Sequence, residues 1–277
     1  MLNMINTPKM LNTVKVISVS LAFTVVSQLT FAVSTDEQAA QDKGMNIFVE
    51  SKARDTGWED FTADMLMTLR NEQGQKSERE VKMKSLEQLD DGDKSITMFN
   101  KPKDVRGTTF LSYSHPVGAD DQWLYLPSLK RVKRISSRNK SGPFMGSEFS
   151  FEDLGSFEIE KYSYKYLEDE VIEGMDNYKV EQYPLDENSG YSKRIVWVDK
   201  QQYRIVKIEF YDRKKSLLKT LSYHDFKLYL DKYWRANTST MVNHQNGKST
   251  ELKWDNYVFR TGLEEADFNR NALRRTR

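Results

Sequence analysis

The sequence contains no cysteine, and this absence bounds what the protein can be. It excludes disulfide bonds, thiolate zinc sites and a catalytic cysteine. It also excludes the lipidated cysteine that anchors a bacterial lipoprotein to a membrane. The mature chain is therefore expected to be soluble and not tethered.

The motifs of common catalytic sites are missing as well. The three histidines, His115, His224 and His244, lie far apart and none belongs to an H-E-x-x-H pattern. Ser147 follows Gly146, but no second glycine completes a G-x-S-x-G elbow. The sequence also lacks a P-loop and a G-x-G-x-x-G motif. We therefore predict a protein that is not an enzyme and that carries no cofactor and no metal.

Acidic residues leave one catalytic alternative open. Neighbouring carboxylates such as Asp90 and Asp91, or Glu152 and Asp153, could serve a glycosidase. With 41 acidic residues, however, such neighbours also arise by chance as turn or helix-capping residues. A hydrolase of envelope lipids or glycans is therefore kept as the less favoured hypothesis.

An excess of charge of one sign is also absent. The chain of 277 residues has 42 basic and 41 acidic residues, which does not indicate a nucleic-acid partner. Aromatic residues make up 12% and hydrophobic residues 38%, enough for a core. Composition therefore predicts a globular protein.

A long apolar run occurs only near the N-terminus. Lys9 and Lys15 precede an apolar stretch from Val16 to Val33, and small residues stand before Asp36. This order is typical of a cleaved secretory signal peptide, and interspersed polar residues argue against a membrane anchor. We predict a signal peptide over residues 1–34, a single domain over 35–277, and a location in the periplasm.

The rest of the chain alternates with the period of β-strands. Met65, Met67 and Leu69 share one face of a strand from Phe61, and Val81 and Met83 continue the pattern after a turn. About a dozen strands follow at hairpin spacing, with a helix expected at 39–54 and a short helix at 267–275. The expected fold class is mostly β (α+β), with a single large curved antiparallel sheet.

A stretch in the middle of the chain joins a basic strand to an apolar loop. Residues 123–135 read WLYLPSLKRVKRI, and residues 144–153 read FMGSEFSFED after a Gly-Pro turn. These motifs resemble the outer-membrane lipoprotein-sorting protein family, distant relatives of the periplasmic carrier LolA. The resemblance implies a half-barrel whose concave face is covered by a few helices. It does not place LolA's lid-holding arginine on any residue here.

The function that the resemblance implies is lipid binding. A periplasmic carrier would hold the acyl chains of lipoproteins or lipids in an apolar cavity, for transport toward the outer membrane. Exposed methylenes cost about 0.8 kcal/mol each, so a soluble carrier must shield its cargo. The flexible methionines and the aromatic loop are the candidate ligand-binding residues of the cavity and its lid. They are Met65, Met67, Leu69, Met83, Trp123, Tyr125, Phe144, Met145, Phe149 and Phe151.

Basic residues of the same stretch are a candidate docking surface. Lys130, Arg131, Lys133 and Arg134 could contact an inner-membrane transporter or anionic lipid head groups during transient membrane contact. A solvated strand face is the alternative interpretation. The protein is expected to be a monomer. A periplasmic sensing or interaction module that binds a protein partner with the same sheet is a further alternative function.

Overall fold

The computed structural model describes residues 35–271 and 273, and the predicted signal peptide, residues 1–34, lies outside them. The described part begins with helix α1 (Thr35–Arg54). Thirteen strands follow within these residues. They are β1 (Asp60–Arg70), β2 (Lys76–Leu86), β3 (Lys94–Lys101), β4 (Thr109–Tyr113), β5 (Asp121–Leu126), β6 (Arg131–Ile135), β7 (Tyr162–Ile172), β8 (Met175–Pro184), β9 (Tyr191–Asp199), β10 (Ile205–Asp212), β11 (Leu217–Tyr229), β12 (Tyr233–Asn243) and β13 (Ser249–Phe259).

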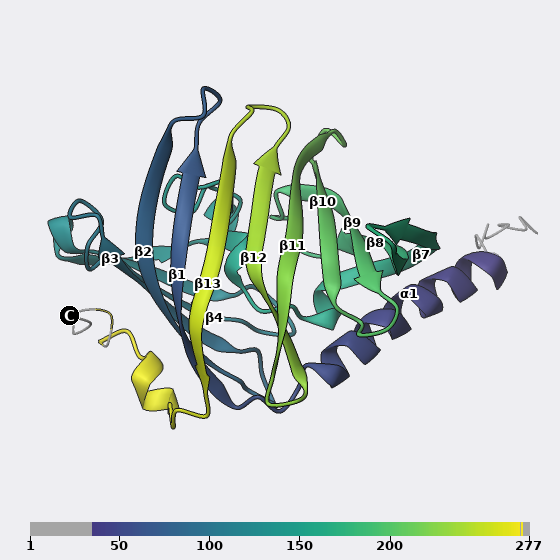
Figure 1. The fold of residues 1–277 in the computed structure, drawn as a ribbon, viewed down its shortest axis with the longest axis horizontal. Helices are drawn as coiled ribbons and strands as arrows, with labels where there is room; N and C mark the ends of the chain where they lie inside the picture. The colour runs from purple at the N-terminus through teal and green to yellow at the C-terminus, as the bar shows by residue number, and fades with distance from the viewer. Residues whose placement is uncertain (1–34, 272, 274–277) are drawn as a thin grey trace, which may run out of the picture. The chain divides into compact units, whose positions relative to one another are not determined.

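All of these strands belong to one antiparallel sheet. Its order is β6-β5-β4-β3-β2-β1-β13-β12-β11-β10-β9-β8-β7 (Figure 1). Strand β1 pairs with both β2 and β13, and so joins two meanders that each run between neighbours in sequence. Strands β6 and β7 are the two edges, so the sheet is open. The predicted fold class, mostly β with a single large sheet, is confirmed.

Period-two alternation places the core residues on one face of the sheet. Met65 stands opposite Val81 of β2 and opposite Trp254 of β13. Met65 and Met67 are buried in the main core cluster, and Leu69 packs against it. This cluster lies on the face that we call concave. The predicted hairpin is confirmed, with Met65, Met67 and Val81 in the cluster, whereas Met83 is half-buried outside it.

The sheet must curve, because one short segment contacts strands that a flat sheet would hold far apart. Phe144 packs against Phe110 of β4 at 5.2 Å between ring centroids. Nine residues later, Asp153 accepts a hydrogen bond of 2.8 Å from Tyr191 of β9. Eight strand spacings separate β4 from β9 in the sheet order. In a flat sheet β4 and β9 would lie about 38 Å apart. Nine fully extended residues span only about 30 Å, so the plug could not contact both strands.

Helix α1 packs on the concave side of β7 and β8. It begins at Thr35, four residues before the predicted start. A Cβ atom on Gly44 would lie 2.9 Å from the backbone nitrogen of Tyr166, so only glycine allows the helix to come this close. One turn later, Phe48 is fully buried against Tyr164, with ring centroids 5.1 Å apart.

The C-terminal segment covers part of the opposite, convex face. The expected helix at 267–275 is instead a 3-10 turn, η5 (Glu265–Phe268), within the described residues. Phe268 and Leu273 are fully buried there against Ile96, Leu111 and Trp123 of β3, β4 and β5. A few helices were expected over the concave face; within the described residues α1 is the one α-helix there, and residues of the connection between β6 and β7 also pack on this face.

Candidate functional site

The connection between β6 and β7 folds into the concave face. We call residues 142–155 the plug. The backbone N–H of Phe144 donates to the carbonyl of Phe149 at 2.7 Å, and Met145 and Gly146 turn the chain with φ of 50° and 76°. Ser150 and Asp153 then form a capping box at the 3-10 turn η3 (Phe151–Leu154). The plug therefore has a defined loop structure of its own.

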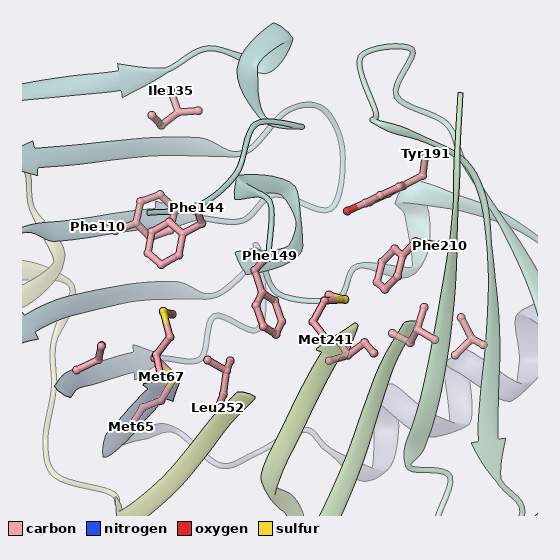
Figure 2. Packing of buried hydrophobic residues seen from close by; sticks show 14 of the residues in the cluster. Met65, Met67, Phe110, Ile135, Phe144, Phe149, Tyr191, Phe210, Met241 and Leu252 are labelled. Atoms are coloured by element: carbon pink, nitrogen blue, oxygen red, sulfur yellow. The ribbon is translucent and has the colours of Figure 1, made fainter. Parts of the chain in front are cut away.

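Aromatic side chains of the plug complete the core. Phe144 is 1% exposed and lies among Phe99, Phe110 and Phe151 at 5.2 to 5.8 Å between centroids. Figure 2 shows Phe149 between this group and the residues Met241 and Leu252 of β12 and β13. Side chains thus fill the concave space beneath the plug.

A buried ion pair ties the plug to the sheet. Lys219 of β11 and Asp153 of the plug are each about 5% exposed or less at the side chain, and Lys219 Nζ lies 2.7 Å from Asp153 Oδ2. The same ammonium donates to the carbonyl of Glu148 at 2.8 Å. Burial alone would raise the pKa of Asp153, but Lys219 and the hydrogen bonds from Ser150 lower that pKa below its usual value. This contact network was not predicted from sequence.

The ten predicted binding residues separate into groups. Met65, Met67, Phe144 and Phe149 are buried in the concave core, and Leu69, Met145 and Phe151 pack against it. Trp123 and Tyr125 belong to the convex cluster under the C-terminal segment, because β5 alternates and turns Leu124 and Leu126 to the concave side. Met83 is half-buried on β2, opposite Ala63 and Thr97. The sequence placed all ten around one cavity, and the structure does not bring them together.

A cavity of about 880 Å³ lies beside the plug, and other residues line it. None of the ten predicted residues is among them. The wall is formed by the end of α1, the loop 87–93, the segment 156–160 and residues 202–205, together with parts of β11, β12 and β13. Five aromatic or aliphatic lining residues also pack against the concave core: Phe157, Tyr203, Ile205, Tyr223 and Trp254.

Part of this cavity wall could be predicted from the sequence. Tyr223 and Trp254 each stand two residues after a buried core residue of the same strand, Leu221 and Leu252. Strand alternation therefore predicts that they face the concave side. The loop 87–93 carries no such periodic signal, so its place in the wall could not be predicted.

The wall also carries buried charge. Glu158 is 2% exposed and pairs with Lys52 of α1. Nearby, burial raises the pKa of Asp93 to about 7; the neighbouring carboxylates Glu158 and Glu87 add to this effect, while the N–H of Gln88 and Lys52 oppose it. One end of the cavity is therefore polar and acidic, and the other is aromatic.

The predicted docking residues lie on the edge strand of the sheet. Lys130, Arg131, Lys133 and Arg134 are all exposed on or beside β6. Arg134 pairs with Asp121 of the neighbouring strand. The other three have no ion-pair partner in the described part of the chain. Their arrangement fits either a docking surface or a solvated edge, because charged side chains also protect exposed strand edges.

The histidines and acidic residues do not assemble into a catalytic or metal centre. His115 contacts Asp91 at 3.1 Å, whereas His244 contacts Thr220 at 2.8 Å on another part of the sheet. No group of three or more potential metal ligands occurs among residues 35–271 and 273. No helix in that range is long and apolar enough to cross a bilayer.

Comparisons with known proteins agree with this architecture. A family model described as an uncharacterized protein matches residues 91–275. A crystal structure of an outer membrane lipoprotein-sorting protein domain from Vibrio parahaemolyticus is 61% identical, with a TM-score of 0.83, over 84% of this chain and 99% of that one. The chain belongs to this lipoprotein-sorting family.

More distant structures share the fold. A DUF1329 family protein from Desulfovibrio piger is 28% identical, with a TM-score of 0.80, over 84% of this chain and 99% of its own. A LolA superfamily protein from Nitrosomonas europaea is 22% identical, with a TM-score of 0.63, over 87% of this chain and all of its own. None of these three relatives is described as an enzyme. Among curated proteins, none matches this chain.

Proposed function

We propose that this lipoprotein-sorting family member is a periplasmic carrier that binds the acyl chains of a lipoprotein or lipid and moves them toward the outer membrane. The observation that carries the proposal is the cavity of about 880 Å³ on the concave side. Its size falls within the range of about 300–1,000 Å³ that is usual for small-molecule sites. The relative from Vibrio parahaemolyticus, described as a lipoprotein-sorting domain, supports the same class of cargo.

The aromatic part of the wall is suited to an acyl chain. Tyr223, Trp254 and Phe157 are partly buried, and they contact the concave core on one side and the cavity on the other. Each methylene shielded there gains about 0.8 kcal/mol relative to water. In this proposal the concave-core residues Met65, Met67 and Phe149 support the cavity floor from behind.

The cargo enters beside the plug and not beneath it. The plug is held by the buried pair of Lys219 and Asp153, so opening it would expose an ion pair and several packed rings. The exposed lining residues Leu89, Asp90 and Lys232 mark the side of the cavity that is open to solvent. We therefore place the entrance at this rim.

Export and docking complete the proposal. The charged, apolar and small-residue order of segment 1–34 supports secretion to the periplasm, where a carrier between two membranes would act. The exposed basic residues Lys130, Arg131 and Lys133 would contact an inner-membrane exporter or anionic head groups, at about 1 kcal/mol for each residue near a membrane surface.

The carried cargo can be tested directly. Protein purified from the periplasm, without detergent, should retain a lipid or an acylated peptide that mass spectrometry of an organic extract detects. A periplasmic protein of similar size prepared in parallel controls for lipid carried over from lysis. An extract that matches this control, together with no binding of added acyl-chain ligands, would contradict the carrier function.

A further inference from the structure

We propose that the cavity selects amphiphiles with a positively charged head group, an amine or a quaternary ammonium, over those with an anionic head group. This inference rests on the proposed function, because it assumes that the cavity holds an acyl chain. It adds the chemical class of the cargo, which the family resemblance leaves open. The charges and the aromatic faces of the wall carry the inference.

The charges that line the cavity are unequal. Eight carboxylates and five lysine or arginine side chains line it. Two carboxylates are neutralised within the wall, since Lys52 pairs with Glu158 and Arg235 with Asp55. In the described residues, the other six have no lysine or arginine partner. They are Glu87, Asp90, Asp91, Asp93, Glu160 and Asp231.

The remaining basic side chains are already engaged. Arg204 pairs with Asp199 at 2.7 Å, and Arg54 pairs with Glu50 at 2.7 Å. Neither acid belongs to the cavity wall. Lys232 donates to the carbonyl of Thr56 at 2.6 Å and is the one lining cation without a carboxylate partner in the described part of the chain. An anionic head group would therefore meet repulsion from those of the six carboxylates that are ionised, and Lys232 would be the one ammonium group without a carboxylate partner.

Two neighbouring carboxylates add negative charge around Asp93. Its pKa is raised to about 7, first by burial and then by Glu158 and Glu87. Burial disfavours a charge of either sign, whereas the two neighbouring carboxylates favour a cation at this place. Lys52 lowers the pKa of Asp93 but does not return it to its ordinary value. An ammonium group bound here would add a second positive charge beside these carboxylates.

Aromatic rings of the wall provide the second part of a cation site. Arg204 already lies over Phe226 and Trp234 at 4.4 and 4.6 Å from their centroids, which shows that rings at this cavity accept a cation. Among the described residues, no lysine or arginine lies over Trp254, Tyr257 or Tyr223. Cation–π contact with aromatic faces is how proteins recognise quaternary ammonium groups, and a ligand ammonium can use those faces of the wall that its acyl chain leaves uncovered.

The test compares head groups on one chain length. Dodecyltrimethylammonium, dodecyl maltoside and dodecyl sulfate are titrated below their micelle concentrations into the purified protein at low ionic strength, with calorimetry as the readout. We expect the ammonium to bind at least tenfold more tightly than the sulfate, with the maltoside between them. Equal or tighter binding of the sulfate overturns the head-group inference but leaves the carrier function intact. Binding of none of the three overturns both.

Matched double variants test whether carboxylates at the rim of the cavity cause the head-group preference. Asp90→Asn combined with Glu160→Gln removes two exposed lining carboxylates that make no hydrogen bond within the described residues. The ratio of sulfate to ammonium dissociation constants should fall by about threefold, as for loss of exposed ion pairs. Glu72→Gln combined with Glu78→Gln, on exposed positions away from the cavity, should leave the ratio unchanged. An equal fall in both double variants would assign the preference to net charge and overturn the site.

Discussion

The charged pair of Lys219 and Asp153 is buried more deeply than any other ion pair in the described residues. An ion pair of this kind gives little net stability, yet loss of one partner leaves a buried charge without compensation. Lys219 also donates to the carbonyl of Glu148, so it holds two points of the plug at once. The position of the plug therefore depends on this lysine.

Lys219→Met should lower the free energy of unfolding by about 3–5 kcal/mol, because Asp153 then stays buried without its cation. Urea denaturation followed by circular dichroism measures the change. Lys253→Met, which removes a lysine that is 58% exposed at the side chain on β13, should change the free energy of unfolding by less than about 0.5 kcal/mol. Similar losses in the two variants would show that the plug does not depend on the buried pair.

Asp93 makes the stability of the folded chain depend on pH. Its folded pKa of about 7 lies above the ordinary value of 3.8, so the folded state binds the proton more tightly than the unfolded state does. This contribution is fully present at low pH and is lost as the pH rises from about 4 through about 7. Asp93→Asn removes it, and asparagine can keep the acceptor for the N–H of Gln88, at 3.2 Å.

The variant should therefore gain stability relative to the native chain as the pH rises from 5 to 8. Urea midpoints of the two proteins at several pH values give the difference, in which contributions from other titrating groups cancel. A difference between Asp93→Asn and the native chain that stays constant with pH would show that Asp93 titrates normally.

Single residues also mark the limit of prediction from sequence. Alternation correctly predicted that Met65 and Met67 share a buried face, because the period of a strand is local. The same alternation separates Trp123 from Leu124, but it cannot say which of them faces the concave side. That choice depends on the curvature of the whole sheet and on where Phe268 packs, 145 residues after Trp123 in the chain.

At the scale of elements, the strands were predictable and the covering segments were not. Each strand follows from period-two patterns and turn residues, such as the hairpin between β1 and β2. The plug has no periodic signal, since left-handed residues and a capping box define its path. The C-terminal segment was expected as a helix, yet its contribution is to bury Phe268 and Leu273 on the convex face.

The C-terminal segment should contribute strongly to stability. Phe268 is 0% exposed, and its carbonyl accepts a hydrogen bond from Tyr113. Phe268→Ala should lower the free energy of unfolding by about 3–5 kcal/mol, because truncation leaves a cavity beside Ile96 and Leu111. Val258→Ala, at a position 53% exposed on the preceding strand, should change it by less than about 1 kcal/mol. A loss no greater than that of the control would show that this segment detaches without cost.

At the scale of the whole molecule, the described residues combine a filled core with an open cavity. The plug fills the space between β4 and β9, and the cavity remains beside it, near the end of α1. A curved sheet with one apolar face has to be covered by the protein itself or by a ligand. In this chain the plug covers part of the face, and the cavity leaves space for a ligand beside it. The sequence could predict the curved sheet and its apolar face. It could not predict how much of that face the protein fills with its own side chains.

In the proposed carrier this division sets where cargo would bind, and two tryptophan variants distinguish the concave cavity from the convex face. The hypothesis drawn from sequence alone expects Trp123→Ala to weaken lipid binding. The structure instead places Trp123 on the convex face, with its ring centroid 5.1 Å from that of Tyr113. Trp254 lines the cavity. We therefore expect Trp254→Ala to reduce the lipid recovered from periplasmic protein several-fold, and Trp123→Ala to lower thermal stability while the recovered lipid per folded molecule stays constant. Mass spectrometry with an internal standard, normalised to folded protein, measures both. The reverse result would place the binding site on the convex face, beneath the C-terminal segment. Removing a side chain that contacts the ligand weakens binding, and removing one on the other face does not.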